Sequence, residues 1–398
     1  MNRALLVLVG AAAASACRGE TPRAIDESRL HTLVDSLRPA IERAAGLGFR
    51  DSVRVRMTTR DEVRAYLAAQ VDQDFPPGRL EGLQAAYGLL RMLPDSLDLR
   101  ALLLDLYAEQ VAGYYDPEVR TLYAVRGTDP MQVRLIFAHE LVHALQHQYL
   151  PLDSLMSVGD DADRLAATQA VLEGHAHVVS IRTITSGRDP TTEPGFWDLS
   201  RQQIRTAQEQ MESVRRAPLV LRERLVFPYL GGAEFIVAWS ATRGRSLPGV
   251  DSFPTSTEQV LHPSRYPADL PHTVRFTAAD EVLFEDTLGE LDTAILLAEL
   301  RGARTADAEA PLGWGGDRLR AYGSDAGPAL VWYSVWDAAP PADRMAGMLE
   351  RQFAPREGYR VSVERLALGG HPAVRLVHAP AGWSGWTELP AATVLGRP

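Results

Sequence analysis

The sequence predicts an α+β protein that is mostly helical, with a small sheet and an active-site helix, followed by a small C-terminal α+β module. Three observations predict this class. Most of the first 300 or so residues carry apolar side chains at helical spacing. An apolar helical segment at 135–150 contains polar residues at fixed spacing. From about residue 306 onward, the pattern changes to two strands, a helix and two more strands.

Composition indicates an ordinary globular protein and excludes some functions. The chain has 398 residues, 46% of them hydrophobic, which is enough for two domains. The net charge of −10 is spread without a basic run, so we expect no nucleic acid as a partner. All 41 basic residues are arginine, which excludes Schiff-base chemistry on lysine. Nothing in the composition indicates the oligomeric state.

The N-terminus has the pattern of an export signal. Residues 1–16 combine Arg3, a short apolar stretch and the small residues Ala14, Ser15 and Ala16. Cys17, the only cysteine, follows at once, which resembles a bacterial lipobox although Ala14 replaces the usual leucine. Ordinary cleavage after the same small residues is the alternative. We expect residues 17–28 to form a tether, lipidated at Cys17, that anchors the protein to a membrane of the bacterial cell envelope.

The first part of the mature chain alternates helices with short strands. An amphipathic helix is expected at 29–45, a strand at 51–59, and helices from 61 to 106 with breaks near 75–78 and Pro94. A second strand, 121–125, follows the turn signal Asp116-Pro117. It could be an edge strand that pairs with a substrate backbone, or a plain internal strand.

A larger helical region follows these strands. We expect helices at 135–150, 160–181, 197–216 and 286–302, and Asp129-Pro130 is the start signal of the first of them. A break is expected at 188–195 and a turn-rich segment at 254–271. The apolar stretch 225–241 fits either a strand or a buried helix. We therefore place one domain at 29–305 and the C-terminal module at 306–398, where alternating aromatic residues indicate core packing.

The segment 139–143 reads His-Glu-Leu-Val-His, the HExxH pattern. On a helix, residues four apart lie on one face, so His139 and His143 can both bind one Zn²⁺. Glu140 is placed to act on a zinc-activated water as general base. The alternative is a structural helix whose histidines pair with neighbouring residues. The apolar context after a strand favours the metal site.

A catalytic zinc needs a third protein ligand and an open position. Four residues are candidates: Glu173, His175, His177 and His147. His147 lies one turn beyond His143 and is too far along the helix to share the ion, so we expect a supporting or packing role for it. Glu173 is our preferred ligand, and His177, on the same helical face, could hydrogen-bond a ligand. We expect His175 to be a solvent-facing or packing residue.

HELVH with a downstream Glu in LEG resembles the gluzincin branch of the zincin metallopeptidases. The resemblance implies a zincin-like core in which His139, His143 and Glu173 bind zinc and Glu140 is the base. In that family an Asp usually follows the ligand Glu by four residues, whereas this chain has His177 there. Further segments resemble poorly characterised bacterial lipoproteins with such a core: GYYDP, HELVHALQ, LEG, YLGGAEF, STEQVLHPSRY and GWGGDR.

An oxyanion formed during amide hydrolysis needs hydrogen-bond donors. His262 and Tyr266, four apart in a proline-rich segment, are the best candidates, and Tyr229 beside two glycines is another. All three could equally be packing residues. The glycine-rich segment 313–318 is expected to be a structural corner.

Two classes of function remain. The first is a zinc-dependent peptidase of the cell envelope that acts on a peptide or protein substrate, with a cell-wall amidase as a variant. The alternative is a non-catalytic envelope lipoprotein scaffold with a structural or relic zinc site. A fourth zinc position closed by His177 or His147 would favour the scaffold.

Overall fold

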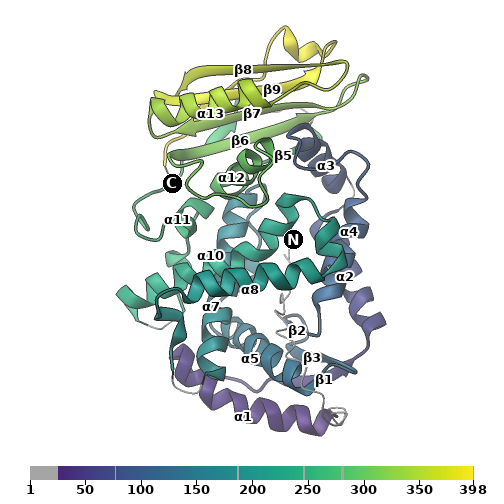
Figure 1. The fold of residues 1–398 in the computed structure, drawn as a ribbon, viewed down its shortest axis with the longest axis vertical. Coiled ribbons are helices and arrows are strands. Elements are labelled where there is room, and N and C mark those ends of the chain that lie inside the picture. Colours follow the sequence, from purple (N-terminus) through teal and green to yellow (C-terminus); the bar gives the residue numbers. More distant parts are fainter. Residues whose placement is uncertain (1–25, 77, 186–187, 245–246, 279–281, 398) are drawn as a thin grey trace.

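The computed structural model describes residues 26–397 except 77, 186–187, 245–246 and 279–281. The predicted signal peptide and Cys17 lie outside the described residues. The α+β class is confirmed, because helices make up the body of the molecule and small sheets lie at its ends (Figure 1). The outer helices are α2 (Arg60–Asp74), α3 (Arg79–Leu89), α4 (Leu99–Gln110), α6 (Leu152–Leu155), α8 (Phe196–Gln210) and α9 (Glu212–Arg216).

A three-stranded sheet lies next to the HExxH helix. It consists of β1 (Arg54–Thr58), β2 (Gly113–Asp116) and β3 (Thr121–Val125) in the order β1-β3-β2. β3 pairs in parallel with β1 and antiparallel with β2. The strand at 121–125 is therefore central: of the two alternatives, the plain internal strand is confirmed and the substrate-pairing edge is wrong. β2, which sequence analysis missed, is the edge strand that contacts the helix.

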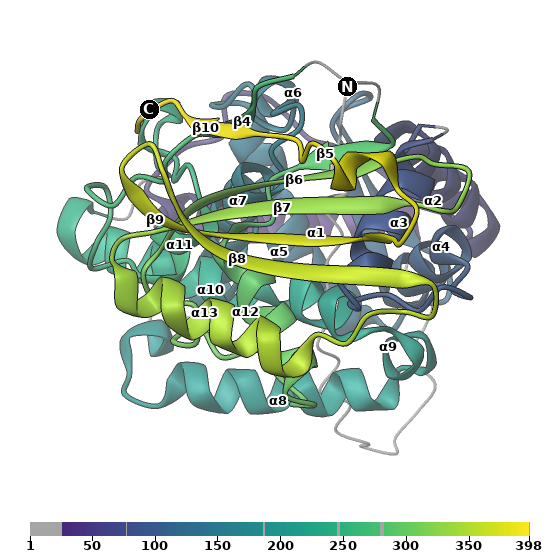
Figure 2. The same ribbon diagram turned by 90° about the horizontal axis from the view of Figure 1, so that it is seen from above.

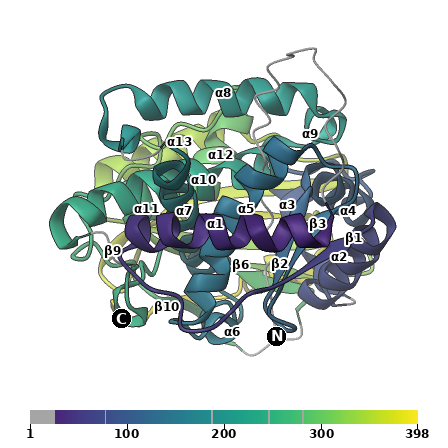
Figure 3. The ribbon, with the colours of Figure 1, turned by 90° about the horizontal axis from the view of Figure 1, so that it is seen from below.

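The HExxH helix α5 (Pro130–His147) begins where the sequence predicts. The Asp129 carboxylate accepts hydrogen bonds from the amides of Met131 and Gln132, and Pro130 occupies the first turn, where its missing N–H costs nothing. Nearly all of its last three turns are buried. α1 (Glu27–Ala45) covers this helix from below, burying its leucine stripe (Figure 3).

The two longest helices, α7 (Ala162–Ile184) and α10 (Leu219–Arg243), pack directly against each other. The apolar stretch at 225–241 is thus a helix. Glycines make the close crossing possible, because a Cβ on Gly174 would lie 2.2 Å from the carbonyl carbon of Gly232. Among the described residues, α10 is the one helix long and apolar enough to cross a membrane, although half of its most apolar window is buried.

A five-stranded antiparallel sheet forms the C-terminal end, in the order β5-β6-β7-β9-β8 (Figures 1 and 2). The predicted two strands, helix and two strands are confirmed, and the aromatic residues of β7 are buried as expected. β5 precedes residue 306, so this sheet contains strands from both predicted domains. The boundary between the two domains stays a prediction. The elements are β5 (Phe284–Asp286), β6 (Trp314–Tyr322), β7 (Ala329–Trp336), α13 (Ala339–Gln352), β8 (Tyr359–Leu368) and β9 (His371–Pro380).

The two faces of this sheet are covered differently. Alternate residues of β7 contribute to two cores, Trp332 on one face and Tyr333 on the other. The first core also contains α13 and α12 (Gly289–Leu300), and so joins the sheet to the helical body. On the other face lie β4 (Val274–Phe276) and β10 (Ala392–Val394), which pair antiparallel. The remaining short helix, α11 (Thr257–Leu261), lies in the segment predicted to be turn-rich.

Candidate metal centre

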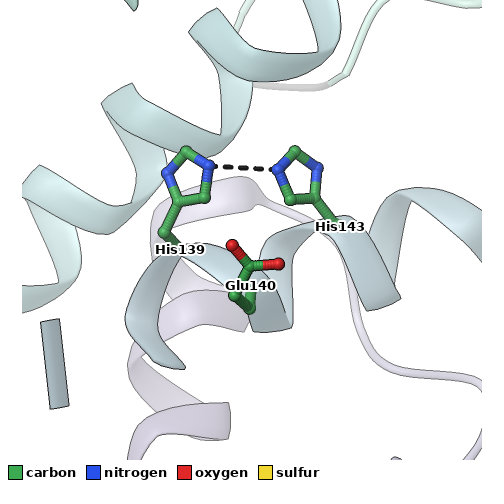
Figure 4. A group of neighbouring side chains, drawn as sticks. All are labelled: His139, Glu140 and His143. Carbon is green, nitrogen blue, oxygen red and sulfur yellow. Dashed lines mark hydrogen bonds between the residues drawn. The ribbon is translucent and has the colours of Figure 1, made fainter. Parts of the chain in front are cut away.

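The two histidines of the HExxH motif face each other on α5. Their Nε2 atoms are 3.0 Å apart and both side chains are buried (Figure 4). Glu173 on α7 completes the group: its Oε2 lies 3.0 Å from Nε2 of His139 and 3.5 Å from Nε2 of His143. Tetrahedral zinc with bonds of about 2.0–2.1 Å holds its ligand atoms about 3.3 Å apart. The three atoms therefore have the spacing that one zinc ion requires.

Glu140 belongs to the same cluster but has different surroundings. Possible ligand atoms of His139, Glu140 and His143 lie within 4.8 Å of one another, so these three also form a possible metal-binding group. Glu140 Oε2, however, accepts a hydrogen bond of 2.9 Å from the backbone amide of Tyr115 in β2. Glu173 faces both histidine nitrogens directly and is the better third ligand. Glu140 therefore lies next to the three ligand atoms but is not one of the ligands.

Electrostatics show that the three ligand atoms require positive charge between them. Burial would raise the pKa of Glu173, but the neighbouring His143 and the hydrogen bonds from both histidines lower that pKa to about 2. Burial would lower the pKa of His143, but the Glu173 carboxylate outweighs it and raises that pKa to about 9. The buried carboxylate thus remains charged against a cation, and a bound metal ion can take the place of the imidazolium proton.

Glu140 has a raised pKa and one oxygen without a protein partner among the described residues. Burial is the main cause that raises its pKa to about 8. Its Oε1 has no hydrogen-bond partner within the part of the chain that the structure describes, whereas Oε2 is held by Tyr115. A carboxyl group with one oxygen anchored and the other available is placed to exchange a proton with a molecule beside it, and a cation bound to the histidines would favour its ionised form.

Gln146 supports the second histidine, and sequence analysis did not identify it. Its Oε1 lies 2.8 Å from His143 Nδ1, which fixes Nε2 as the atom that faces the metal position. Its Nε2 donates to the carbonyl of Leu172 at 2.7 Å and lies 3.1 Å from Nδ1 of His175. The available signal was the spacing in HELVHALQ, because a residue three positions after His143 lies on the same helical face. His175 is buried, which confirms packing rather than solvent exposure.

The first histidine lacks such support. Nδ1 of His139 is buried and, among the described residues, has no hydrogen-bond partner. The ring of His177 is 6.5 Å from that of His139, measured between centroids, and the Tyr229 ring is 6.0 Å away. His177 thus packs near His139 without bonding its nitrogen. Among the described residues, no carboxylate therefore holds Nδ1 of His139.

An apolar pocket adjoins the candidate ligands. It has a volume of about 230 Å³, and both Glu173 and Tyr229 line it. The two arginines that line it are paired with carboxylates: Arg224 Nε lies 2.8 Å from Asp292 Oδ1, and Arg79 Nη2 lies 3.3 Å from Asp286 Oδ2. Most other lining side chains are apolar, among them Leu99, Leu103, Tyr107, Val220, Leu221 and Leu225.

The structure gives His262 and Tyr266 other partners. His262 Nε2 lies 3.1 Å from Glu290 Oε2, and the Tyr266 hydroxyl donates to the carbonyl of Ser252 at 2.8 Å. The Tyr266 ring packs against Phe235 and Trp239. Among the described residues, none of these partners belongs to the group around His139 and His143. The tyrosine that the fold brings to that group is Tyr229.

His147 does not face the metal position. Its Nδ1 lies 3.0 Å from the hydroxyl of Tyr115, the residue whose amide holds Glu140. The supporting or packing role expected for His147 agrees with this contact. Neither His147 nor His177 is placed as a fourth ligand.

Comparisons with known proteins add little on function. Residues 278–379 match a family described as a domain of unknown function (DUF8575). No curated protein matches the chain significantly. One solved structure, of a Chloroflexus aurantiacus protein provisionally described as a hydrolase with a novel fold, is 20% identical with a TM-score of 0.38. The similarity covers 62% of this chain and 90% of that one. The matched family segment begins after the residues of the metal centre, so this site is supported by its geometry alone.

Proposed function

We propose that this protein is a zinc-dependent peptidase of the gluzincin type that hydrolyses amide bonds at the bacterial cell envelope. The observation that carries the proposal is the triangle of His139 Nε2, His143 Nε2 and Glu173 Oε2, with edges of 3.0, 3.0 and 3.5 Å. The envelope location follows from the export pattern and Cys17.

Each polar residue of the site has a distinct role in this reaction. His139, His143 and Glu173 would hold the zinc, which supplies Lewis-acid activation of water and of the scissile carbonyl. Glu140 accepts the proton of the attacking water at Oε1, the oxygen without a protein partner, and returns it to the leaving amine. The Tyr115 amide keeps the carboxylate in place during both transfers.

The surroundings support an extended peptide with an apolar side chain as the substrate. β2 is an edge strand whose Tyr115 amide already faces the site, and an added strand is a common mode of peptide recognition. The apolar pocket lined by Glu173 and Tyr229 is of a size for one large side chain. Tyr229 is the candidate donor to the oxyanion, in place of His262 and Tyr266.

The test separates metal binding from catalysis. Zinc content by elemental analysis and hydrolysis of a peptide library with apolar residues are measured for wild type, Glu140→Gln and Glu173→Ala. We expect about one zinc per wild-type chain, retained by Glu140→Gln with hydrolysis at least about 100-fold slower. Glu173→Ala should lose both zinc and activity. Glu234→Gln, which removes the same charge from α10 at a half-exposed position, should change neither.

Two results would contradict the peptidase. Full hydrolysis by Glu140→Gln would exclude this carboxylate as the base. Zinc binding by the wild type with no hydrolysis of any peptide in the library would indicate the envelope scaffold instead. Membrane attachment is tested separately, because Cys17→Ala should release the protein from the membrane fraction.

A further inference from the structure

A second cluster of carboxylates lies where the helical body meets the C-terminal sheet. Glu258 in α11, Asp269 in the segment that follows it and Asp337 directly after β7 each offer a carboxylate oxygen. These oxygens lie within 4.8 Å of one another, although the residues come from separate parts of the chain. The cluster shares no residue with the group around the HExxH motif.

Glu258 is the unusual member of this cluster. Its side chain is buried, with a relative exposure of 1%, and among the described residues neither carboxylate oxygen has a hydrogen-bond partner. Burying an ionised carboxylate without a partner is costly, and folded proteins normally pair such a group. His262, the residue directly after α11, faces another carboxylate, because its Nε2 lies 3.1 Å from Glu290 Oε2. Glu258 is therefore a buried carboxyl group that lacks a protein partner. Burial raises its pKa, and a cation bound beside it would favour its ionised form.

Two arginines pair with the other two members of the cluster. Arg265 Nη1 lies 3.4 Å from Asp269 Oδ2, and Arg397 Nη2 lies 3.5 Å from Asp337 Oδ1. The side chains of Arg265 and Arg397 are 35% and 40% solvent-exposed. Such pairs are weak in water and leave the inner carboxylate of Glu258 uncompensated.

We propose that Glu258, Asp269 and Asp337 form a binding site for a hard divalent cation, and specifically Ca²⁺. All three ligands are oxygens, which favour Ca²⁺ or Mg²⁺ over zinc. Mg²⁺ keeps several water ligands and is usually bound by one or two carboxylates, whereas Ca²⁺ takes more protein oxygens in a flexible geometry. Three carboxylates at one position therefore favour Ca²⁺. The exposed side of Asp337 leaves room for water ligands.

The bound ion would connect two parts of the fold. Asp337 is held at the end of β7 by its amide, which donates to the carbonyl of Gly313 at 2.9 Å. Glu258 and Asp269 belong to the α11 segment that packs on the helical body. Ca²⁺ would therefore join the sheet to this segment, and its role is structural rather than catalytic. The proposal does not depend on the peptidase function.

The test uses purified, chelator-treated full-length protein and Ca²⁺ alone as the probe. Isothermal titration and thermal unfolding are measured with Ca²⁺ and, separately, with Mg²⁺. We expect the wild type to bind one Ca²⁺ and to unfold at a higher temperature when Ca²⁺ is present, because the ion binds the folded state. Asp269→Asn combined with Asp337→Asn should raise the Kd for Ca²⁺ at least tenfold.

Three further variants make the outcome decisive. Glu258→Gln replaces an unpartnered buried carboxyl group by a neutral amide of the same size, so the cation-free protein should be at least as stable as the wild type while losing the response to Ca²⁺. Asp325→Asn removes a charge from an exposed turn of the same sheet and should keep the response. His139→Ala should also keep it, which separates this site from the metal centre.

Equal responses to Ca²⁺ in the wild type and the Asp269/Asp337 double variant would overturn the site. So would a wild type that does not respond to Ca²⁺ at millimolar concentration. Tighter binding of Mg²⁺ than of Ca²⁺ would overturn the choice of ion.

Discussion

At the scale of single residues, the metal centre depends on side chains that the HExxH pattern does not contain. Gln146 connects His143, the Leu172 carbonyl and His175 across two helices. It therefore orients one ligand and at the same time ties α5 to α7, the helix that carries Glu173. Supporting residues of this kind affect metal affinity although they never touch the ion.

Gln146→Leu should weaken zinc binding about 10- to 100-fold, because His143 loses the partner of its Nδ1. It should also lower the free energy of unfolding by about 1–3 kcal/mol, since the Leu172 carbonyl loses its buried donor. Zinc affinity is measured by competition with a chromophoric chelator, and stability by urea unfolding. Gln202→Leu, on the exposed face of α8, is the control. An unchanged zinc affinity would show that Gln146 does not orient His143.

At the scale of elements, the site requires α7 to lie against both α5 and α10. The contact with α10 is close because two glycines meet: a Cβ on Gly232 would lie 2.0 Å from the carbonyl oxygen of Ala170. Gly174 sits directly after the ligand Glu173. The packing of α7 on α10 thus sets the depth at which Glu173 reaches the histidines.

Gly174→Ala should destabilise the protein by about 1–3 kcal/mol or more, because the added methyl group would meet backbone atoms that cannot move aside independently. It should also weaken zinc binding, since any shift of α7 displaces Glu173. Both effects are measured by urea unfolding and by zinc content. Gly249→Ala is the matched control, because its Cβ would meet nothing within 4 Å and its φ is −70°. A fully stable Gly174→Ala protein would show that the crossing is looser than described.

At the scale of the whole molecule, buried carboxylates fasten the C-terminal sheet to the helical body. Asp317 in β6 accepts hydrogen bonds from the amides of Leu288 and Gly289, at 2.9 and 2.8 Å, and from the Trp332 indole at 2.9 Å. It thereby holds the start of α12 beneath the sheet. The glycine-rich segment 313–318 was expected to be a structural corner, but residues 314–318 belong to strand β6, whose pairing with β7 is irregular between Trp314 and Gly316.

This carboxylate predicts a pH dependence of stability. Burial raises the pKa of Asp317 to about 6 in the folded protein. Between about pH 4 and pH 6 the folded state therefore binds more protons than the unfolded state, so the contribution of Asp317 to stability rises as the pH falls. A difference of about two pKa units corresponds to about 3 kcal/mol.

Urea unfolding of the wild type and Asp317→Asn at pH 7 and pH 4 measures this contribution. The stability advantage of the wild type should grow by about 3 kcal/mol from pH 7 to pH 4, because the variant has no group to protonate. Asp325→Asn, in an exposed turn of the same sheet, should show no such change relative to the wild type. A stability difference that is independent of pH would mean that Asp317 titrates normally in the folded protein.

The sequence by itself determined the local features of this protein. Apolar spacing placed most helices, Asp129-Pro130 marked the start of α5, and the strand pattern of the C-terminal module was read correctly. His139 and His143 could be paired because a helix brings residues four apart together without help from the rest of the chain. The segment 225–241 stayed ambiguous, because a continuous apolar run fits a buried strand as well as a buried helix.

Only the tertiary structure decided which distant residues meet. Glu173 reaches the histidines because α7 packs on α5, while His262 and Tyr266 face Glu290 and Ser252 instead. The strand at 121–125 became central only because β1 and β2 pair on either side of it. Glu258, Asp269 and Asp337 likewise come close together only because the sheet packs against the helices. Spacing along the chain determines contacts within one element, but contacts between elements depend on packing, which has no period in the sequence.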